Sequence, residues 1–184
     1  MPRLDKNHFS SLCRSAGASD WRLHMELKEG AFYIVKDSFY DLMPDCGLLF
    51  NKESDENGVH GRPCVYCFRD GGYCWMVPIS SRVRKYQAVM EHKAEKFGSC
   101  DNILLGNVYG QMRAFLIQNA FPCKEEHIVA PYWYDKDKTP VYCGRKMCAV
   151  LHRRMKKVVS AYRAGKSLTI SKIACIIQNM EREG

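Results

Sequence analysis

Apolar segments separated by glycine-containing turns predict antiparallel hairpins. Residues 63–69 and 73–78 are rich in aromatic, β-branched and cysteine residues, and Asp70-Gly71-Gly72 separates them. A second hairpin is expected at residues 102–108 and 111–118. Further short strands are expected at residues 31–36, 127–134 and 140–143. Together these segments indicate a sheet of several antiparallel strands.

Two longer segments carry apolar residues at helical spacing. Residues 82–97 form the first and are followed by Gly98; residues 146–163 form the second and are followed by Gly165. The apolar stripes consist of Val83, Tyr86, Met90 and Phe97 in the first helix, and of Val150, Leu151, Met155, Val158, Val159 and Tyr162 in the second. Each helix therefore has one face to pack on the sheet.

The order of these elements predicts an α+β fold. We expect a small, strongly bent, barrel-like antiparallel sheet with inserted and C-terminal helices. Shorter helices are expected at residues 37–43, with Asp37 as N-cap, and near residues 169–181, while residues 51–61 form a polar loop.

The composition fits one globular domain. The chain has 184 residues, of which 46% are hydrophobic and 26% charged, so a disordered chain, a collagen-like fibre and a coiled-coil rod are excluded. Residues 1–30 show weak periodicity and are expected to be an N-terminal extension to a single domain over residues 31–184. No apolar run approaches the roughly 20 residues of a membrane span, and the N-terminus lacks the apolar core of a secretory signal. We therefore expect a soluble, cytoplasmic protein.

Ten cysteines raise the question of disulfides or a metal site. Since the chain is not visibly exported, disulfides are not expected. Cys64 and Cys67 form the one CxxC motif, but residues three apart on a strand point to opposite faces and cannot easily share a metal ion. We expect free, buried thiols and no metal or cofactor; a structural zinc site is the alternative.

The net charge of +8 comes from one C-terminal segment. Residues 138–180 hold ten basic residues and no Asp or Glu, whereas the rest of the chain has 18 basic and 20 acidic residues, a net of −2. The ten are Lys138, Arg145, Lys146, Arg153, Arg154, Lys156, Lys157, Arg163, Lys166 and Lys172. A segregated basic segment indicates a polyanionic partner, with nucleic acid as the first candidate. The alternative is a solvated basic face.

Several segments, taken in chain order, resemble one family. They are Phe32-Tyr33-Ile34-Val35, Arg62-Pro63-Cys64-Val65-Tyr66, Val77-Pro78-Ile79-Ser80-Ser81, Lys85-Tyr86, residues 114–122 and the closing basic helix. This order is similar to the toxins of type III toxin–antitoxin systems, the ToxN, CptN and TenpN group, with CptN or TenpN closer than ToxN. The resemblance covers about residues 31–180. ToxN has lysines near the serine turn and before its first hairpin strand, where the nearest equivalents in this chain are Arg62, Arg84 and Lys85.

The resemblance implies a sequence-specific endoribonuclease with a fold like those of MazF, Kid and CcdB. It also implies that the antitoxin is a repeated noncoding RNA, which the toxin cuts from its precursor along with cellular RNA. The processed pseudoknot RNA then inhibits the toxin in a closed protein–RNA hetero-oligomer. Phage defence, or maintenance of a plasmid or locus, is the implied biological role.

Metal-free RNA cleavage needs a proton acceptor for the 2′-OH, a proton donor for the leaving 5′-oxygen, and donors for the charge on phosphorus. Ser80 and Ser81 can supply hydroxyls and backbone N–H groups at a helix N-terminus. Arg62 offers a planar fork for phosphate oxygens, and Lys85 is a better proton-transfer group than arginine. We therefore expect these four residues to be catalytic. The alternatives are that the serines only cap the helix and that Arg62 is a solvated charge.

RNA binding is expected from basic side chains around the serine turn and along the C-terminal helix. The expected residues are Arg82, Arg84, Arg145, Lys146, Arg153, Arg154, Lys156 and Lys157. Asn119 is either a turn residue or a base reader. The histidines at 60, 92, 127 and 152 form no recognisable pair, and Trp75 and residues 132–134 are expected in the core rather than as stacking platforms.

Two alternative functions remain. A non-catalytic RNA- or DNA-binding protein would need only the basic segment and not the serine turn. The second alternative is a structural or regulatory protein whose basic face binds another protein or a membrane. A helix with that role would be a free amphipathic anchor, whereas the apolar stripe of residues 146–163 indicates a helix packed on a core.

Overall fold

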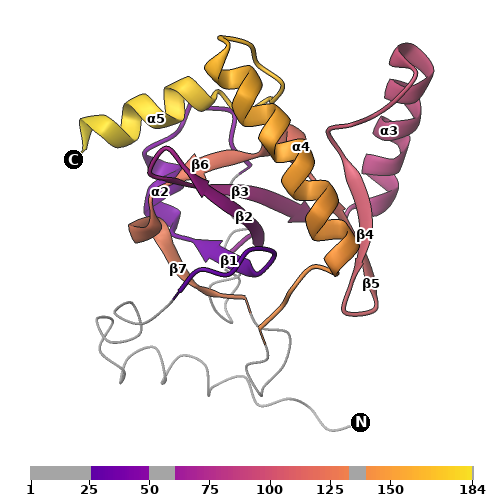
Figure 1. The fold of residues 1–184 in the computed structure, drawn as a ribbon, viewed down its shortest axis with the longest axis horizontal. Coiled ribbons are helices and arrows are strands. Elements are labelled where there is room, and N and C mark those ends of the chain that lie inside the picture. Colours follow the sequence, from indigo (N-terminus) through magenta and orange to yellow (C-terminus); the bar gives the residue numbers. More distant parts are fainter. Residues whose placement is uncertain (1–25, 50–60, 133–139, 184) are drawn as a thin grey trace, which may run out of the picture.

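The computed structural model describes residues 26–49, 61–132 and 140–183. Within these residues seven strands form one antiparallel sheet in the order β4-β5-β3-β2-β1-β7, and β6 pairs with β3 (Figure 1). The strands are β1 (Phe32–Val35), β2 (Cys64–Asp70), β3 (Tyr73–Ser80), β4 (Leu104–Val108), β5 (Gln111–Phe115), β6 (Phe121–Cys123) and β7 (Ile128–Pro131). The helices are α2 (Asp37–Asp41), α3 (Val83–Phe97), α4 (Arg145–Arg163) and α5 (Ile173–Arg182), with short 3₁₀ turns η2 (Ile117–Asn119) and η3 (Glu125–His127).

The predicted α+β class is confirmed, but the sheet does not close into a barrel. In the part of the chain that the structure describes, β4 and β7 lie at opposite ends of the pairing order and do not pair with each other. The β4–β5 hairpin joins β3 only through Ile79–Phe115 and Ser80–Ala114. Because the first half of β3 pairs instead with β6, the hairpin diverges from the rest of the sheet.

Both predicted hairpins are present. Strands β2 and β3 flank a turn in which Gly71 and Gly72 have positive φ values of 61° and 83°, a conformation that favours glycine. The second hairpin ends at Phe115, earlier than expected, because residues 117–119 turn as η2 and redirect the chain. Strand β6, which follows, was not predicted.

Each face of the sheet carries its own core. Helix α4 lies across one face, where Leu151, Met155, Val158 and Val159 pack with Val65 and other residues of β2, β3 and β5 (Figure 1). On the other face α2 and α5 pack against the alternate side chains of β2 and β3, and Phe39, Ile176 and Met180 are buried there. The predicted stripe of the C-terminal helix is thus confirmed except at Val150, which does not belong to the core cluster.

Helix α3 extends away from the body and has no buried residue (Figure 1). Its half-buried side chains Tyr86, Val89 and Met90 pack on a small cluster formed by Ile103, Ala114 and Leu116. The Lys93 ammonium adds hydrogen bonds to Gln118 Oε1 at 2.8 Å and to Asn102 Oδ1 at 3.2 Å. Phe97, expected in the apolar stripe, is 69% exposed, because the helix extends past the cluster that it covers.

The expectation that all cysteines are free is wrong. Of the nine cysteines that the structure describes, four form disulfides, Cys46–Cys175 and Cys143–Cys148. The first links cysteines 129 positions apart, which only the packing of α5 against the segment after α2 brings together. Cys64 and Cys67 are buried on opposite faces of the sheet, as the strand argument predicts. Among the described residues no group of three or more His, Cys, Asp or Glu side chains could hold a metal ion.

Some boundaries differ from the expected ones. Asp37 is the first residue of α2 and Lys36 is its N-cap. Helix α5 begins at Ile173 rather than near residue 169, because the Ile170 and Lys172 N–H groups donate to the carbonyls of Gln118 and Cys46. Residues 51–60 of the expected loop, Trp133, Tyr134 and His60 lie outside the described residues. Gly30 already belongs to the fold, because its N–H donates to the Tyr66 carbonyl.

Candidate active site and nucleic-acid interface

The β2–β3 hairpin brings Arg62 to the end of β3. Cys64 pairs with Pro78, and the Ile79 N–H donates to the Pro63 carbonyl at 3.1 Å, so the register places Arg62 across from Ser80. The Arg62 guanidinium donates to the Ile79 carbonyl at 3.2 Å. Arg62 is therefore held by the strand next to the serine turn and is not a merely solvated charge.

The two serines lie in different environments. Ser80 ends β3, is 7% exposed, and its hydroxyl oxygen accepts the Arg82 N–H at 3.2 Å. Ser81 is exposed, and its carbonyl accepts the Val83 N–H at 2.8 Å. Neither hydroxyl caps the helix, because the N-cap of α3 is Arg82 and no side chain caps it. The Ser80 hydroxyl supports the turn, whereas the Ser81 hydroxyl faces solvent.

The first turn of α3 is strongly positive. It contains no acidic residue, and Arg82, Arg84 and Lys85 are all exposed. Cations at the positive end of a helix dipole are unfavourable by about 0.3–1 kcal/mol each, and a bound anion offsets that cost. The Val83 N–H donates to the Ser81 carbonyl, whereas the next N–H groups at the start of a helix have no partner within the helix. The start of α3 is therefore suited to an RNA phosphate.

Two buried groups near Arg62 can be excluded as proton acceptors. Burial raises the pKa of the Cys64 thiol to about 12, against a smaller opposing effect of the Arg62 guanidinium. Burial likewise raises the pKa of the Tyr40 hydroxyl well above its ordinary value. Both groups therefore stay protonated at neutral pH.

The basic segment does not lack acidic partners in the folded protein. Arg154 pairs with Asp101 at 3.1 Å and also donates to its carbonyl at 2.7 Å, and Arg163 pairs with Asp70. The Lys156 ammonium lies 5.6 Å from the centre of the Phe68 ring. These side chains, on the two flanks of α4, are therefore partly occupied by contacts within the protein.

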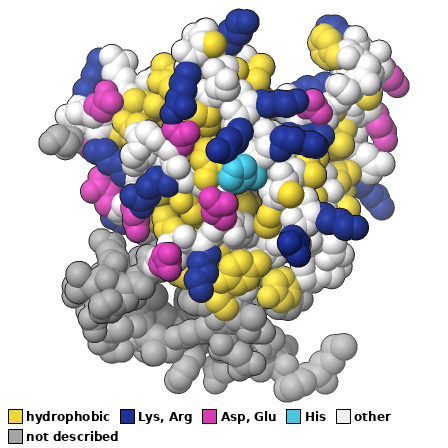
Figure 2. Space-filling view, viewed as in Figure 1, with side chains coloured by type: hydrophobic (Ala, Val, Ile, Leu, Met, Phe, Trp, Pro, Cys, Tyr) yellow, Lys and Arg dark blue, Asp and Glu magenta, His cyan; other side chains and the backbone are white. Residues whose placement is uncertain are grey.

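Three basic residues follow the outer side of α4. Lys146, Arg153 and Lys157 lie within about 40° of one another around a helix of 100° per residue, and all three are exposed. We call them the α4 ridge. Figure 2 shows dark blue side chains gathered over α4, with acidic side chains between some of them. Arg145, also exposed, begins the same helix.

The α4 ridge and the serine turn lie on opposite faces of the sheet. Ile79 belongs to the buried cluster that α4 covers, so the next residue, Ser80, points to the opposite face of the sheet. Cys64 packs on the α2 and α5 face, and Arg62, two residues before it, follows the same alternation. An RNA that contacts both regions has to pass around the edge of the sheet, so we expect the two regions to act separately.

Charge removal on the α4 ridge is expected to weaken RNA binding and flatten its salt dependence. Each lost phosphate contact should lower the salt slope by about 0.7–0.9, so Lys146→Gln/Arg153→Gln/Lys157→Gln should lower it by about 2–3. The measurement is RNA affinity across a salt series. The matched control is Arg154→Gln/Arg163→Gln, since these two charges already have Asp101 and Asp70 as partners. Equal slopes for the ridge variant and the unchanged chain would contradict this role.

Several residues left open by the sequence now have a place. Asn119 lies in η2, is 4% exposed, and its N–H donates to the Leu116 carbonyl, so it is a turn residue. Trp75 is buried, and Tyr132 packs partly buried on the same core. His152 does have a partner, since its Nδ1 lies 3.4 Å from Glu29 Oε2.

Two basic residues on the elements that adjoin the candidate site were not predicted. Arg113 neighbours Ala114, the residue that pairs with Ser80, and Lys93 fastens α3 to η2. Arg113 could have been found from the sequence, because it is an arginine within a predicted hairpin strand. The role of Lys93 had no sequence signal, because its partners come from other elements.

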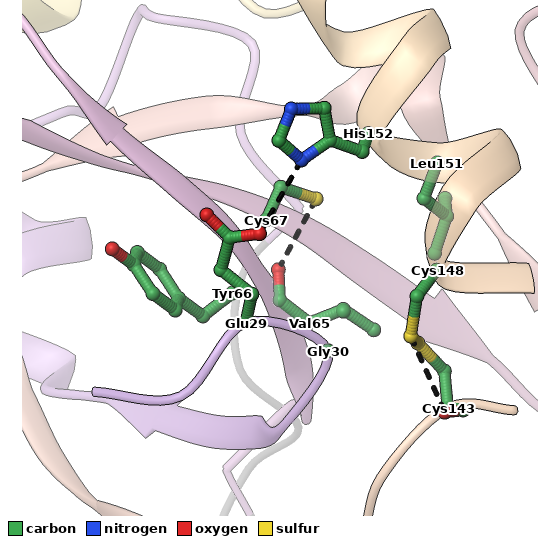
Figure 3. A pocket seen from close by; sticks show the side chains of 9 residues that line it. All are labelled: Glu29, Gly30, Val65, Tyr66, Cys67, Cys143, Cys148, Leu151 and His152. Atoms are coloured by element: carbon green, nitrogen blue, oxygen red, sulfur yellow. Dashed lines mark hydrogen bonds and ion pairs between the residues drawn. A yellow bond between two sulfur atoms is a disulfide. The ribbon is translucent and has the colours of Figure 1, made fainter. Parts of the chain in front are cut away.

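A small cavity lies on the α4 side of the sheet. Its volume is about 20 Å³, and Glu29, Cys67, His152 and the Cys143–Cys148 disulfide are among the groups that line it (Figure 3). A cavity of this size holds about one water molecule. It is therefore not the RNA site. Within the described ranges no helix is long and apolar enough to cross a membrane.

The fold is similar to that of a solved endoribonuclease of the type III toxin–antitoxin class. That protein is AbiQ, a lactococcal anti-phage endoribonuclease; the match has a TM-score of 0.58 and 11% sequence identity, and covers 83% of this chain and 96% of AbiQ. At this identity the likeness shows a shared fold. No protein-family model matches the chain, and no curated protein matches its sequence.

Proposed function

We propose that the chain is an endoribonuclease toxin of a type III toxin–antitoxin system, nearer to CptN and TenpN than to ToxN, with a sheet related to that of MazF, Kid and CcdB. The observation that carries the proposal is the placing of Arg62 across from Ser80, beside the basic first turn of α3. The fold likeness, which extends over nearly all of AbiQ, supports it independently.

In the proposed reaction the 2′-OH attacks the adjacent phosphorus and the 5′-oxygen leaves. The products are a 2′,3′-cyclic phosphate and a 5′-OH, and no metal ion or cofactor takes part. Lys85 transfers a proton, while the Ser81 hydroxyl and the first N–H groups of α3 stabilise the negative charge on the phosphoryl oxygens. Arg62 and Arg84 hold the phosphate. Ser80 stabilises the turn, because its hydroxyl oxygen accepts a hydrogen bond from the Arg82 N–H.

The proposed partner is a repeat-derived pseudoknot RNA that the toxin cuts from its own precursor, in the cytoplasm. The α4 ridge, with Arg145 beside it, would hold the backbone of this RNA on the face opposite the serine turn. Such phosphate contacts position RNA without reading its sequence. Two RNA-contacting regions on opposite faces of one toxin molecule are consistent with a closed assembly of several toxin and RNA molecules.

Cleavage is expected to persist in excess EDTA, because the 2′-OH is an internal nucleophile and the charged groups come from the chain. The measurement is cleavage of cellular RNA by the purified protein, with end-group analysis of the products. Activity that is lost in EDTA and restored by magnesium, or products with 3′-OH ends, would contradict the mechanism. Tight RNA binding without cleavage under all conditions would instead favour the non-catalytic RNA-binding alternative.

A further inference from the structure

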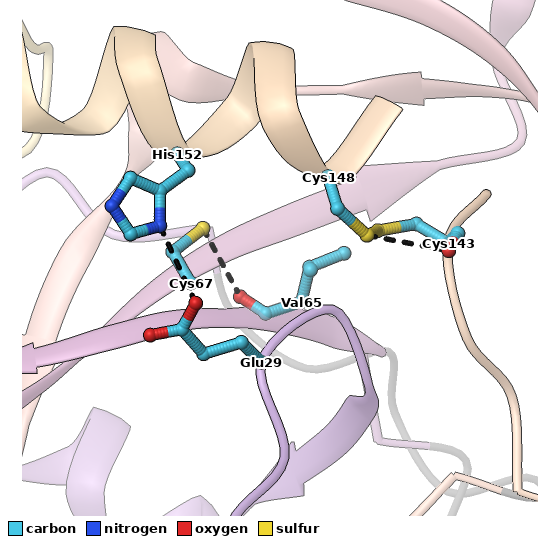
Figure 4. Close-up of a disulfide and its surroundings, with 6 residues drawn as sticks. All are labelled: Glu29, Val65, Cys67, Cys143, Cys148 and His152. Atoms are coloured by element: carbon cyan, nitrogen blue, oxygen red, sulfur yellow. Dashed lines mark hydrogen bonds and ion pairs between the residues drawn. A yellow bond between two sulfur atoms is a disulfide. The ribbon is translucent and has the colours of Figure 1, made fainter. Parts of the chain in front are cut away.

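The Cys143–Cys148 disulfide spans the start of α4. Cys143 directly precedes the N-cap residue Gly144, and Cys148 is the fourth residue of the helix (Figure 4). Side chains on a helix lean toward its N-terminus, so Cys148 is directed back toward Cys143. The bond therefore encloses the whole first turn of α4, including Arg145 and Lys146.

The disulfide also packs on a loop from another part of the chain. A Cβ atom on Gly30 would lie 2.5 Å from Cys148 Sγ and 3.3 Å from Cys143 Sγ, so only glycine fits there. The Cys143 N–H donates to the Gly30 carbonyl at 2.8 Å. One residue earlier, Glu29 pairs with His152, one turn further along α4 (Figure 4). The disulfide thus lies where the Gly30 loop meets the start of α4.

The surroundings of this disulfide differ from those of three buried free thiols. Cys64, Cys67 and Cys123 are buried, and burial raises the pKa of each thiol, which makes them unreactive. Cys46 of the second disulfide is fully buried, whereas its partner Cys175, in the first turn of α5, is partly buried. Cys148 is only partly buried and lies beside the small cavity described above. It is thus the more accessible sulfur of its pair, because Cys143 is 7% exposed.

The start of α4 also favours thiolate anions. No acidic residue lies in its first turn, no side chain caps it, and Arg145 and Lys146 are adjacent. A helix N-terminus with nearby cations stabilises a thiolate and makes it a better leaving group. The Cys143 carbonyl lies 3.2 Å from Cys148 Sγ, so a reduced Cys148 thiol has a hydrogen-bond acceptor already in place. Both redox states are therefore accommodated.

We propose that Cys143–Cys148 is a reversible thiol–disulfide exchange site that reacts with a low-molecular-weight thiol of the glutathione type. The incoming thiolate attacks Cys148 Sγ, the bond between the two cysteines breaks, and Cys143 leaves as a thiolate at the positive end of α4. A second thiolate then attacks the small-molecule sulfur of the mixed disulfide, which releases the small-molecule disulfide and frees Cys148. Two small thiols are oxidised and one protein disulfide is reduced. This inference does not depend on RNA cleavage.

Opening the bond is expected to loosen the first turn of α4 and leave the rest of the helix in place. The later turns remain held by Leu151, Met155, Val158 and Val159, which pack on the sheet. Amide hydrogen exchange should therefore accelerate on reduction at Cys148, whose N–H donates to the Gly144 carbonyl, and stay unchanged at residues 155–159. Exchange that is unchanged at both, or faster at both, would contradict a local opening.

The proposal is tested on the intact chain in a series of glutathione redox buffers, with acid quenching, alkylation and peptide mass spectrometry. Cys143 and Cys148 should become alkylated together, at a less reducing ratio than Cys46 and Cys175. If the Cys46–Cys175 pair opens first or at the same ratio, Cys143–Cys148 is not a selective exchange site.

Two single variants test the assigned direction of attack. Cys143→Ser leaves Cys148 without its partner and should accumulate a glutathione mixed disulfide on Cys148. Cys148→Ser leaves the buried Cys143, which should take up several-fold less glutathione. Equal uptake, or greater uptake in Cys148→Ser, would overturn the assignment. Thermal melting of both variants checks that they fold, and the redox series on the unsubstituted chain needs no variant at all.

Discussion

Ser81→Ala and Lys85→Ala are each expected to reduce RNA cleavage by about 10²–10³-fold while RNA affinity stays within a few-fold of the unchanged chain. Both side chains are exposed at the start of α3, so their removal leaves the core intact. Loss of one donor to a developing oxyanion, or of one proton-transfer group, has effects of this size. Single-turnover cleavage and RNA-binding titrations on the same preparations measure the two quantities.

The same helix supplies matched controls. Lys96 lies at the other end of α3, and its ammonium is 5.3 Å from the Phe97 ring centre, as that of Lys85 is 5.8 Å from the Tyr86 ring centre. Lys96→Ala therefore removes the same kind of side chain and contact away from the serine turn, and Ser99→Ala is the control for Ser81. A fully active Ser81→Ala/Lys85→Ala double variant would place the reaction elsewhere. Substitution of Arg62 is a less specific test of catalysis, because its guanidinium also donates a hydrogen bond to the Ile79 carbonyl and its loss would disturb the strand.

Removal of the Cys46–Cys175 disulfide is expected to lower the free energy of unfolding by several kcal/mol. The bond joins cysteines 129 positions apart and closes most of the chain into one loop. In the chain-entropy model a loop of this length contributes about 5 kcal/mol, whereas the short Cys143–Cys148 loop contributes about 2 kcal/mol. In denaturant unfolding, Cys46→Ala/Cys175→Ala should therefore show the larger decrease in the free energy of unfolding, and Cys143→Ala/Cys148→Ala should show the smaller decrease.

The comparison of the two double variants shows whether loop closure causes the stabilisation by the disulfides. Equal losses would mean that loop closure is not the source of the stabilisation, and that local packing around each bond dominates instead. No loss in Cys46→Ala/Cys175→Ala would mean that the bond does not form in solution. Because alanine replaces both partners, neither variant adds an unpaired thiol to the free cysteines that the chain already has.

Features that depend on neighbouring residues were predictable from the sequence. The β2–β3 hairpin follows from an aspartate and two glycines between β-rich segments, and α4 follows from an apolar stripe that ends before Gly165. The opposite burial of Cys64 and Cys67 follows from strand alternation alone. The hairpin also made the closeness of Arg62 to the serine turn predictable, because a two-stranded register is a local property.

Features that depend on long-range packing were not predictable. The prediction of a barrel was wrong because β3 pairs with β6 along one part and with β5 along another. No local sequence pattern indicates where a strand changes its pairing partner. Ser80 and Ser81 are equivalent as neighbours in sequence, yet pairing of Ser80 with Ala114 buries one and leaves the other exposed. The apolar stripe of α3 predicted a packed helix, but the cluster below it is too short to cover Phe97.

The sequence by itself determined the α+β class, the main hairpins, the docking face of α4 and the excess of positive charge, because each depends on residues a few positions apart. Only the tertiary structure decided which charged side chains have partners within the protein and which thiols form disulfides. Asp101 and Asp70 reach Arg154 and Arg163 from distant segments, and Cys46 meets Cys175 across 129 positions. Such pairs form because the packing of helices on a sheet, rather than any local pattern, determines which side chains become neighbours.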